Sequence, residues 1–153
     1  MGKILLSLVA AFAFATAALS SNLVTAGDPQ AILNIAKGYG SAELSTDNVG
    51  DPQIIGRIDG TRYAVTFYGC DGGENCRHIR IHAHWAEKMS FAQANEWNAE
   101  KLFGKAYVDS DGDAALEMVV NLYGGVSRQN LDDTFDWWKV ALNQFVEFIE
   151  TRA

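Results

Sequence analysis

The sequence predicts a single α+β domain in which helices pack on an antiparallel sheet of about five to six strands. The central segments alternate apolar and polar residues and are joined by short turns, which is typical of antiparallel strands with one buried face. Helical segments stand apart from these strands, and this segregation favours the α+β class. The chain has 153 residues, 48% of them apolar, and this size suits one domain.

The first 26 residues predict an export signal. Lys3 precedes an apolar stretch over 4–19, and small residues follow where a signal peptidase cuts. We expect cleavage after Ala26, with a cut after Ala17 as the alternative, and a domain over 27–153. The apolar stretch is slightly short for a membrane span, which needs about 20 residues. We therefore expect a protein that is periplasmic or secreted and free of the membrane after cleavage.

The domain is expected to begin with a helix and a short strand. Asp28-Pro29 is typical of a helix start, and Gly38 is placed to end that helix. Ile32 and Leu33 give it an apolar side. A short strand around 42–46 follows.

The clearest hairpin joins strands 53–58 and 61–68. Asp59-Gly60 between them is the signal for a type I′ turn, which fixes the register. A slip of one residue would reverse every side chain. The ring of Tyr63 is expected over the bare Gly56. The buried face then has Ile54, Gly56, Ile58, Tyr63, Val65 and Phe67, and the outer face pairs Arg57 with Arg62, Ile55 with Ala64 and Gln53 with Thr66.

Two cysteines flank the next loop. Cys70 and Cys76 enclose Asp-Gly-Gly-Glu-Asn, a turn-forming sequence that can bring them together. In an oxidising compartment a disulfide is the expected state. The alternatives are a redox-active pair, which would lack the usual Cys-x-x-Cys spacing, and a zinc site that uses both thiolates.

Three further segments complete the sheet and its second helix. Strand 77–85 alternates apolar and cationic residues. Ser90 is expected to begin a helix that ends at Gly104, and strands 105–108 and 114–122 form a second hairpin. The core side of this helix is expected to have Phe91, Ala94, Trp97 and Leu102, and the buried face of the hairpin to have Leu116, Met118, Val120 and Leu122.

The last helix, which Ser127 caps, has a broad aromatic face. Its apolar residues follow a spacing of four and three, which keeps them on one stripe: Leu131, Phe135, Trp138, Leu142, Phe145 and Ile149. Trp137 and Phe148 widen the stripe. We expect their surplus surface to contact a protein partner, with a homodimer as one form of that contact. The alternative is that both side chains pack on the domain's own sheet.

Alternation also predicts a cationic outer face on the sheet. A formal net charge of −7 disfavours general nucleic-acid binding, so a local basic patch indicates an anionic partner or surface. Protonation of histidine should strengthen the patch as pH falls. The alternatives are ordinary solvation of a strand face and the binding of a small ligand or a metal. The residues concerned are Arg57, Arg62, Arg80, His78, His82 and His84.

The sequence contains no complete set of residues for a metal site or for catalysis. Three histidines spread along one strand cannot all reach one ion, and the pattern supplies no further ligand. Asp109-Ser110-Asp111-Gly112-Asp113 resembles the start of a calcium loop but has its glycine at the wrong position, and Val120 stands where a glutamate belongs. Ser90 and Ser127 are helix caps, and Glu117 is an isolated acid. The sequence therefore predicts no enzyme and no cofactor.

Two segments resemble the YbjN family of bacterial proteins. The first runs from Glu96 to Asp109 and includes Trp97-Asn98 and Phe103-Gly104. The second runs from Leu116 to Ser127 and ends in Gly124-Gly125-Val126-Ser127. The resemblance implies one YbjN domain over 27–153 with a fold like that of type III secretion chaperones. It also implies a regulatory or chaperone-like role without known catalysis. Phe67-Tyr68-Gly69-Cys70 and Cys76 resemble exported members.

Overall fold

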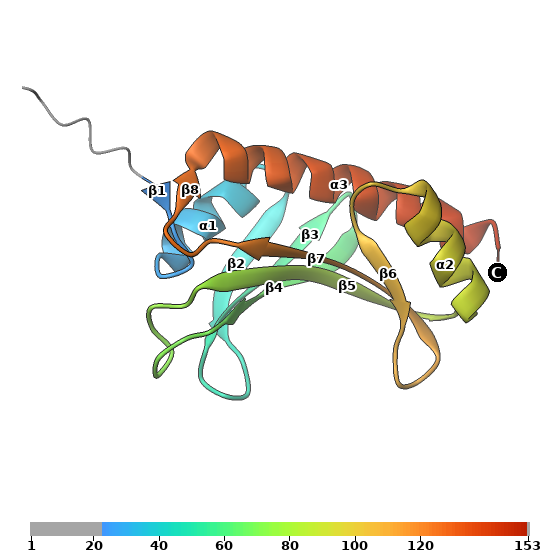
Figure 1. The fold of residues 1–153 in the computed structure, drawn as a ribbon, viewed down its shortest axis with the longest axis horizontal. Helices are drawn as coiled ribbons and strands as arrows, with labels where there is room; N and C mark the ends of the chain where they lie inside the picture. Colours follow the sequence, from blue (N-terminus) through green and yellow to red (C-terminus); the bar gives the residue numbers. More distant parts are fainter. Residues whose placement is uncertain (1–22, 153) are drawn as a thin grey trace, which may run out of the picture.

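The computed structural model describes residues 23–152, and the domain it shows is α+β (Figure 1). Most of the expected export signal, including the alternative cut after Ala17, lies outside the described residues. None of the described helices is long and apolar enough to cross a membrane. The elements are β1 (Leu23–Val24), α1 (Pro29–Ala36), β2 (Ser41–Thr46), β3 (Pro52–Ile58), β4 (Thr61–Tyr68), β5 (His78–Lys88), α2 (Phe91–Glu100), β6 (Lys105–Val108), β7 (Asp113–Asn121), β8 (Val126–Ser127) and α3 (Arg128–Glu150).

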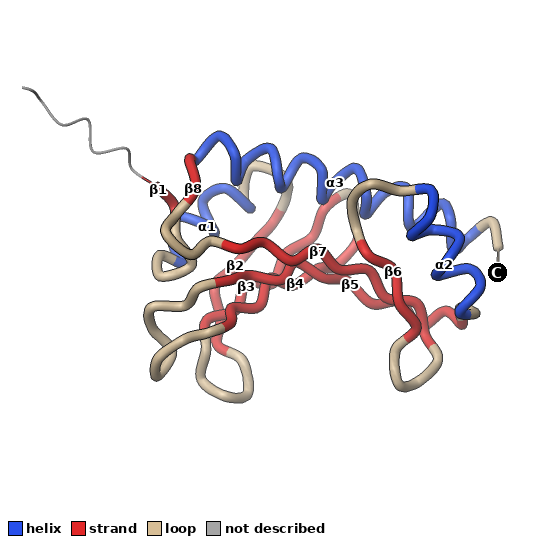
Figure 2. Tube along the Cα trace, viewed as in Figure 1, coloured by secondary structure: helices blue, strands red, loops and turns tan. Residues whose placement is uncertain are grey.

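The main sheet has six antiparallel strands in the order β2-β3-β4-β5-β7-β6. Figure 2 shows the described helices on one side of this sheet, with the long α3 running across the strands. The strands curve, and their other face lies open on the side of the β2–β3 and β6–β7 turns. Because the helices cover one face alone, the side chains that alternate away from them form the uncovered outer face.

The predicted register of the first hairpin is confirmed. Ile58 pairs with Thr61, and the pairing continues to Gln53 with Thr66. Gly60 has φ 90°, and Asp59 has φ 48°, as a type I′ turn requires of its two central residues. A Cβ at Gly56 would lie 2.6 Å from the ring of Tyr63. The ring therefore covers the glycine, as the sequence predicts.

The core lies between the inner face of the sheet and the helices. The expected stripe of α3 is buried along its whole length, and Trp138, Phe135 and Phe145 are fully enclosed. Trp97 of α2 joins them, with its ring centroid 4.9 Å from that of Phe145. Its indole Nε1 donates a hydrogen bond to the carbonyl of Gly104 at 2.7 Å. Burial of several aromatic rings supplies a large share of the hydrophobic stabilisation.

The predicted extent of the second helix is wrong. Ser90 caps α2 as expected, and its hydroxyl accepts from the backbone N–H of Gln93. However, α2 ends at Glu100 because Lys101 is extended, at φ −107° and ψ 134°. Leu102 therefore follows the helix and is 88% exposed, and Phe91 in the first turn is 81% exposed. Neither belongs to the core side that the sequence predicts for them. Strand β5 also runs three residues beyond the predicted 77–85.

A small second sheet, which the sequence does not predict, fixes the N-terminal end of the domain. β1 pairs with β8 through Leu23 with Ser127 and Val24 with Val126. Val24 is 6% exposed, and Ala26 is fully buried. Val24 and Ala26, which are part of the predicted export signal, are therefore packed into the domain.

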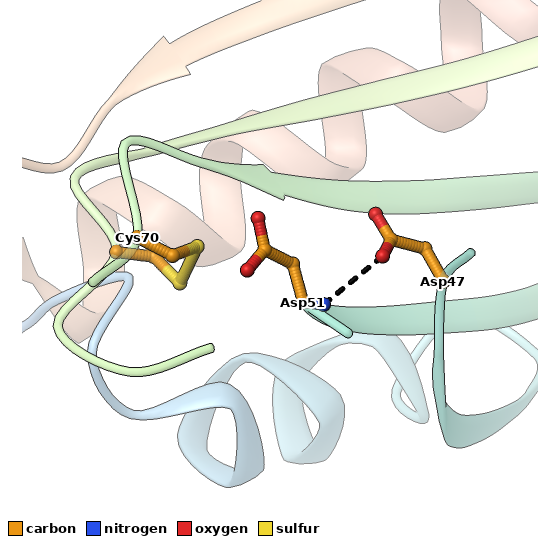
Figure 3. The surroundings of a disulfide bond; sticks show 4 residues. Asp47, Asp51 and Cys70 are labelled. Atoms are coloured by element: carbon orange, nitrogen blue, oxygen red, sulfur yellow. Dashed lines mark hydrogen bonds between the residues drawn. A yellow bond between two sulfur atoms is a disulfide. The ribbon is translucent and has the colours of Figure 1, made fainter. Parts of the chain in front are cut away.

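Cys70 and Cys76 form a disulfide, as expected (Figure 3). Its loop lies beside the β2–β3 turn, where a Cβ at Gly73 would stand 2.9 Å from the carbonyl of Gly50. Within that turn, the Asp47 carboxylate accepts the backbone N–H of Asp51 at 3.0 Å. The disulfide thus closes one of two turns that pack together at the same end of the β3–β4 hairpin.

Candidate binding surface

The six predicted cationic residues all lie on the outer face of the sheet. Arg57 stands directly opposite Arg62, and His82 stands opposite Ala64, one step along the same face. The alternate residues Tyr63 and Ile81 are buried on the inner face. His78, Arg80, His82 and His84 follow one another along β5. The alternation that predicts a shared cationic face is therefore confirmed, although these residues differ in their partners.

Glu117 neutralises the middle of this face. It lies opposite His82 on β5 and Lys105 on β6 and is 9% exposed. Its carboxylate pairs with Lys105 Nζ at 2.5 Å and with the Arg80 guanidinium at 3.6 Å. Arg80 also stacks on Tyr68, with its guanidinium carbon 5.3 Å from the ring centroid. Because Arg80 is already paired with the carboxylate of Glu117, this arginine contributes little to an anion-binding surface.

His84 has its own acidic neighbour at the β6–β7 end. Its Nδ1 lies 3.7 Å from Asp109 Oδ2, and its Nε2 lies 3.4 Å from the hydroxyl of Tyr107. Asp109 Oδ1 accepts the backbone N–H groups of Asp113 and Asp111, and these hydrogen bonds lower the pKa of Asp109. The segment weighed as a calcium loop is therefore a turn closed by its own aspartate.

His82 is neutral at ordinary pH. Both of its ring nitrogens are buried, and neither has a hydrogen-bond partner among residues 23–152. Burial, with the nearby charges of Arg80 and His84, lowers the pKa of His82 to about 4. The expectation that protonated histidines strengthen the patch as pH falls is thus wrong for His82 above about pH 4, because charging a desolvated ring costs free energy.

Arg57 and Arg62 are the outer-face arginines that have no ion pair within residues 23–152. Arg57 donates to the carbonyl of Gly60 at 2.9 Å. Like charges directly opposite each other on a sheet repel, and an anion between them would relieve this repulsion. The basic surface is therefore narrower than the sequence predicts and is centred on the β3–β4 hairpin.

Two shallow hollows flank this arginine pair. One, of about 250 Å³, is lined by Arg57 and Arg62 and also by Glu43. The other, of about 280 Å³, runs from Arg62 over the small side chain of Ala64 to His82. Small side chains in the middle of the face and long ones around them give it a hollowed surface.

The aromatic residues expected to contact a partner behave differently from one another. Trp137 is 42% exposed, and its ring lies 4.7 Å from that of Phe103, beside the exposed Val140. Phe148 is 7% exposed and packs on Trp97, with their centroids 5.4 Å apart. Phe148 therefore belongs to the core, which corrects its assignment as a contact residue.

Metal ligands do not gather on this surface. In residues 23–152, no three His, Cys, Asp or Glu side chains are placed to hold one ion. His82 and His84 have ring centroids 5.4 Å apart. The Nδ1 of His78 instead lies 3.4 Å from the Asn121 side chain. Strand spacing distributes the three histidine rings along β5.

Comparison with known proteins assigns a family to this fold. Residues 28–151 match the family YbjN, whose description is "Putative bacterial sensory transduction regulator". No curated protein relative matches the sequence. The match covers the whole main sheet and the three helices, including both segments that carry the resemblance noted in the sequence. The chain belongs to the YbjN family.

Proposed function

We propose that this protein is an exported, non-catalytic regulatory module that binds an acidic segment of a protein partner. The binding surface is the outer sheet face around Arg57 and Arg62. The family description supports the regulatory part of this proposal. Export draws its support from the predicted signal and from the disulfide between Cys70 and Cys76, because structural disulfides persist in oxidising compartments.

The observation that carries the proposal is the unpaired arginine pair. Several other cations of the domain have a carboxylate neighbour: Lys88 with Asp113, Lys139 with Asp59 and Arg152 with Glu96, in addition to those of the outer face. Arg57 and Arg62 are directly opposite each other in the register of the sheet, on its uncovered side, and neither has a carboxylate within ion-pair distance among residues 23–152. Arginine binds carboxylates through two parallel hydrogen bonds, so this pair is well suited to hold acidic side chains of a partner.

The apolar surface of Trp137 on the opposite side supports a second protein contact. Together with Phe103 and Val140 it leaves aromatic and aliphatic area uncovered, and such area is typical of contact sites. The homodimer expected from the sequence remains a prediction, with Trp137 and not Phe148 in the contact.

The proposal is tested with a fluorescent peptide rich in glutamate and measured by anisotropy. We expect binding that weakens between about 50 and about 300 mM salt, because exposed charges are screened. The double variant R57E/R62E should bind at least about tenfold more weakly.

The matched control is K37E/R128E, which makes the same change of charge at exposed positions away from the outer face. It should bind within about twofold of the wild type. Equal losses in both double variants would show that net charge alone attracts the peptide and would overturn the proposal. Circular dichroism verifies that both variants fold.

A further inference from the structure

A larger hollow, of about 550 Å³, lies where β4 and β5 separate. The ladder between these strands ends at Ala64 opposite His82. Both strands nevertheless continue, β4 back to Thr61 and β5 on to Lys88, where its pairing with β7 shifts register. A bulge of this kind bends a strand and redirects its side chains. The divergence opens the hollow, and the last turns of α3 line it.

The hollow combines an apolar surface with charges of both signs. Trp85, Val146 and Ile149 line it with apolar atoms, and the ring of Trp85 is fixed by packing 5.1 Å from that of Phe145. Two cationic or ionisable groups, Arg62 and His84, also line it, and so do two carboxylates, Glu87 and Glu150.

We propose that this hollow binds a small zwitterion with an apolar side chain, in the chemical class of leucine and phenylalanine. Arg62 would take the carboxylate in a two-pronged hydrogen bond. Glu87 or Glu150 would take the ammonium group. The apolar side chain would lie on Trp85 and α3. The volume falls within the range of about 300–1,000 Å³ that is usual for small-molecule sites.

Simpler ligands fit the same lining less well. A plain anion would satisfy Arg62 but would meet the negative charge of Glu87 and Glu150. A hydrocarbon would cover the apolar surface but would desolvate three charged groups without compensation. A zwitterion with an apolar side chain offers a partner to each kind of group. The inference goes beyond the proposed function. Of the residues that line the hollow, Arg62 and His84 also belong to the cationic residues of the outer face.

The test compares L-leucine with two probes that each lack one charge, by isothermal titration of the full folded domain. The probes are 4-methylpentanoate, without the ammonium group, and isopentylamine, without the carboxylate. We expect leucine to bind and each probe to bind at least about tenfold more weakly. Selective excitation of tryptophan should report the binding, and the W85F variant should lose that signal.

Two charge-neutralising variants locate the site. R62Q and E150Q should each weaken leucine binding at least about fivefold. The matched controls R128Q and E147Q remove the same charges from exposed positions outside the hollow and should leave it unchanged. No heat from leucine or phenylalanine up to about 50 mM, or equal binding of the one-charge probes, would overturn the inference. Neither outcome concerns the binding of the glutamate-rich peptide. We expect the E150Q variant to bind that peptide as the wild type does.

Discussion

His82 shows how one side chain couples the outer face to pH. Its ring nitrogens are buried between Arg80 and His84, and its pKa falls from 6.5 to about 4. In the unfolded chain the ring regains its ordinary pKa. Between those two values the unfolded state binds more protons than the folded state, so the free energy of unfolding decreases as pH falls. The contribution of His82 is therefore complete above pH 6.5 and is lost toward pH 4.

We predict that the wild type loses about 1–2 kcal/mol more than the H82Q variant between pH 6.5 and pH 4.5. This figure is below the full value of the pKa shift because water reaches part of the ring. Urea unfolding at the two pH values measures the difference, and proton NMR follows the His82 ring directly. Two results would contradict this prediction: a His82 ring that titrates near pH 6.5, or an equal loss of unfolding free energy in the wild type and H82Q between the two pH values.

Individual elements differ in how far local sequence determines them. The β3–β4 register follows from the Asp59-Gly60 turn, whose geometry is local, and it was predicted pair by pair. The end of α2 depends on contacts made in the folded state. The backbone N–H of Ala106 donates to the Asn98 side chain at 2.9 Å, and Trp97 bonds to Gly104. Such contacts turn the chain before Leu102 although the apolar spacing continues through it.

In the candidate site too, some features follow from local sequence and others depend on the folded arrangement of the strands. Alternation along each strand was enough to place Arg57, Arg62 and the β5 cations on one face. The role of Glu117 depends on which strands are neighbours, because it reaches Arg80 and Lys105 only in the order β5-β7-β6. The sequence did not determine that order, so it predicted a uniform basic face instead of a local one.

The small β1–β8 sheet leads to a prediction about processing and stability. Removal of residues 23–26 would expose the surface that Val24 and Ala26 cover and would leave Val126 without a strand partner. A chain that begins at Gly27 should therefore be about 2–3 kcal/mol less stable than one that begins at Asn22. Urea unfolding of the two chains measures this difference.

The burial of Val24 and Ala26 also favours one of the two expected signal cuts. A cut after Ala17 keeps β1, whereas a cut after Ala26 removes it. We therefore expect the N-terminus of the exported protein, read by Edman sequencing, to lie before Leu23. Equal stability of the two chains, or an exported protein that begins at Gly27, would show that β1 is dispensable.

Across the whole molecule, stability and recognition occupy different places. The aromatic core lies between α3 and the inner face, while the unpaired arginines and the hollow at Trp85 lie near the Asp59-Gly60 end of the β3–β4 hairpin. The disulfide loop and the β2–β3 turn lie at its other end (Figures 1 and 3). Since the hairpin separates these two ends, a change at the disulfide should affect stability without reaching the candidate sites.

Reduction of the disulfide tests that separation. Cys70 and Cys76 close a short loop, so their bond should contribute about 2 kcal/mol, mainly by restricting the unfolded chain. We predict that the free energy of unfolding of the C70S/C76S variant, measured with urea, is about 2 kcal/mol lower than that of the wild type. The variant should keep its circular dichroism spectrum and bind the glutamate-rich peptide and leucine as the wild type does. Wild type treated with a reductant serves as the control for the two serines. Loss of binding in a variant that remains folded would show that the loop transmits its conformation along the β3–β4 hairpin to Arg62.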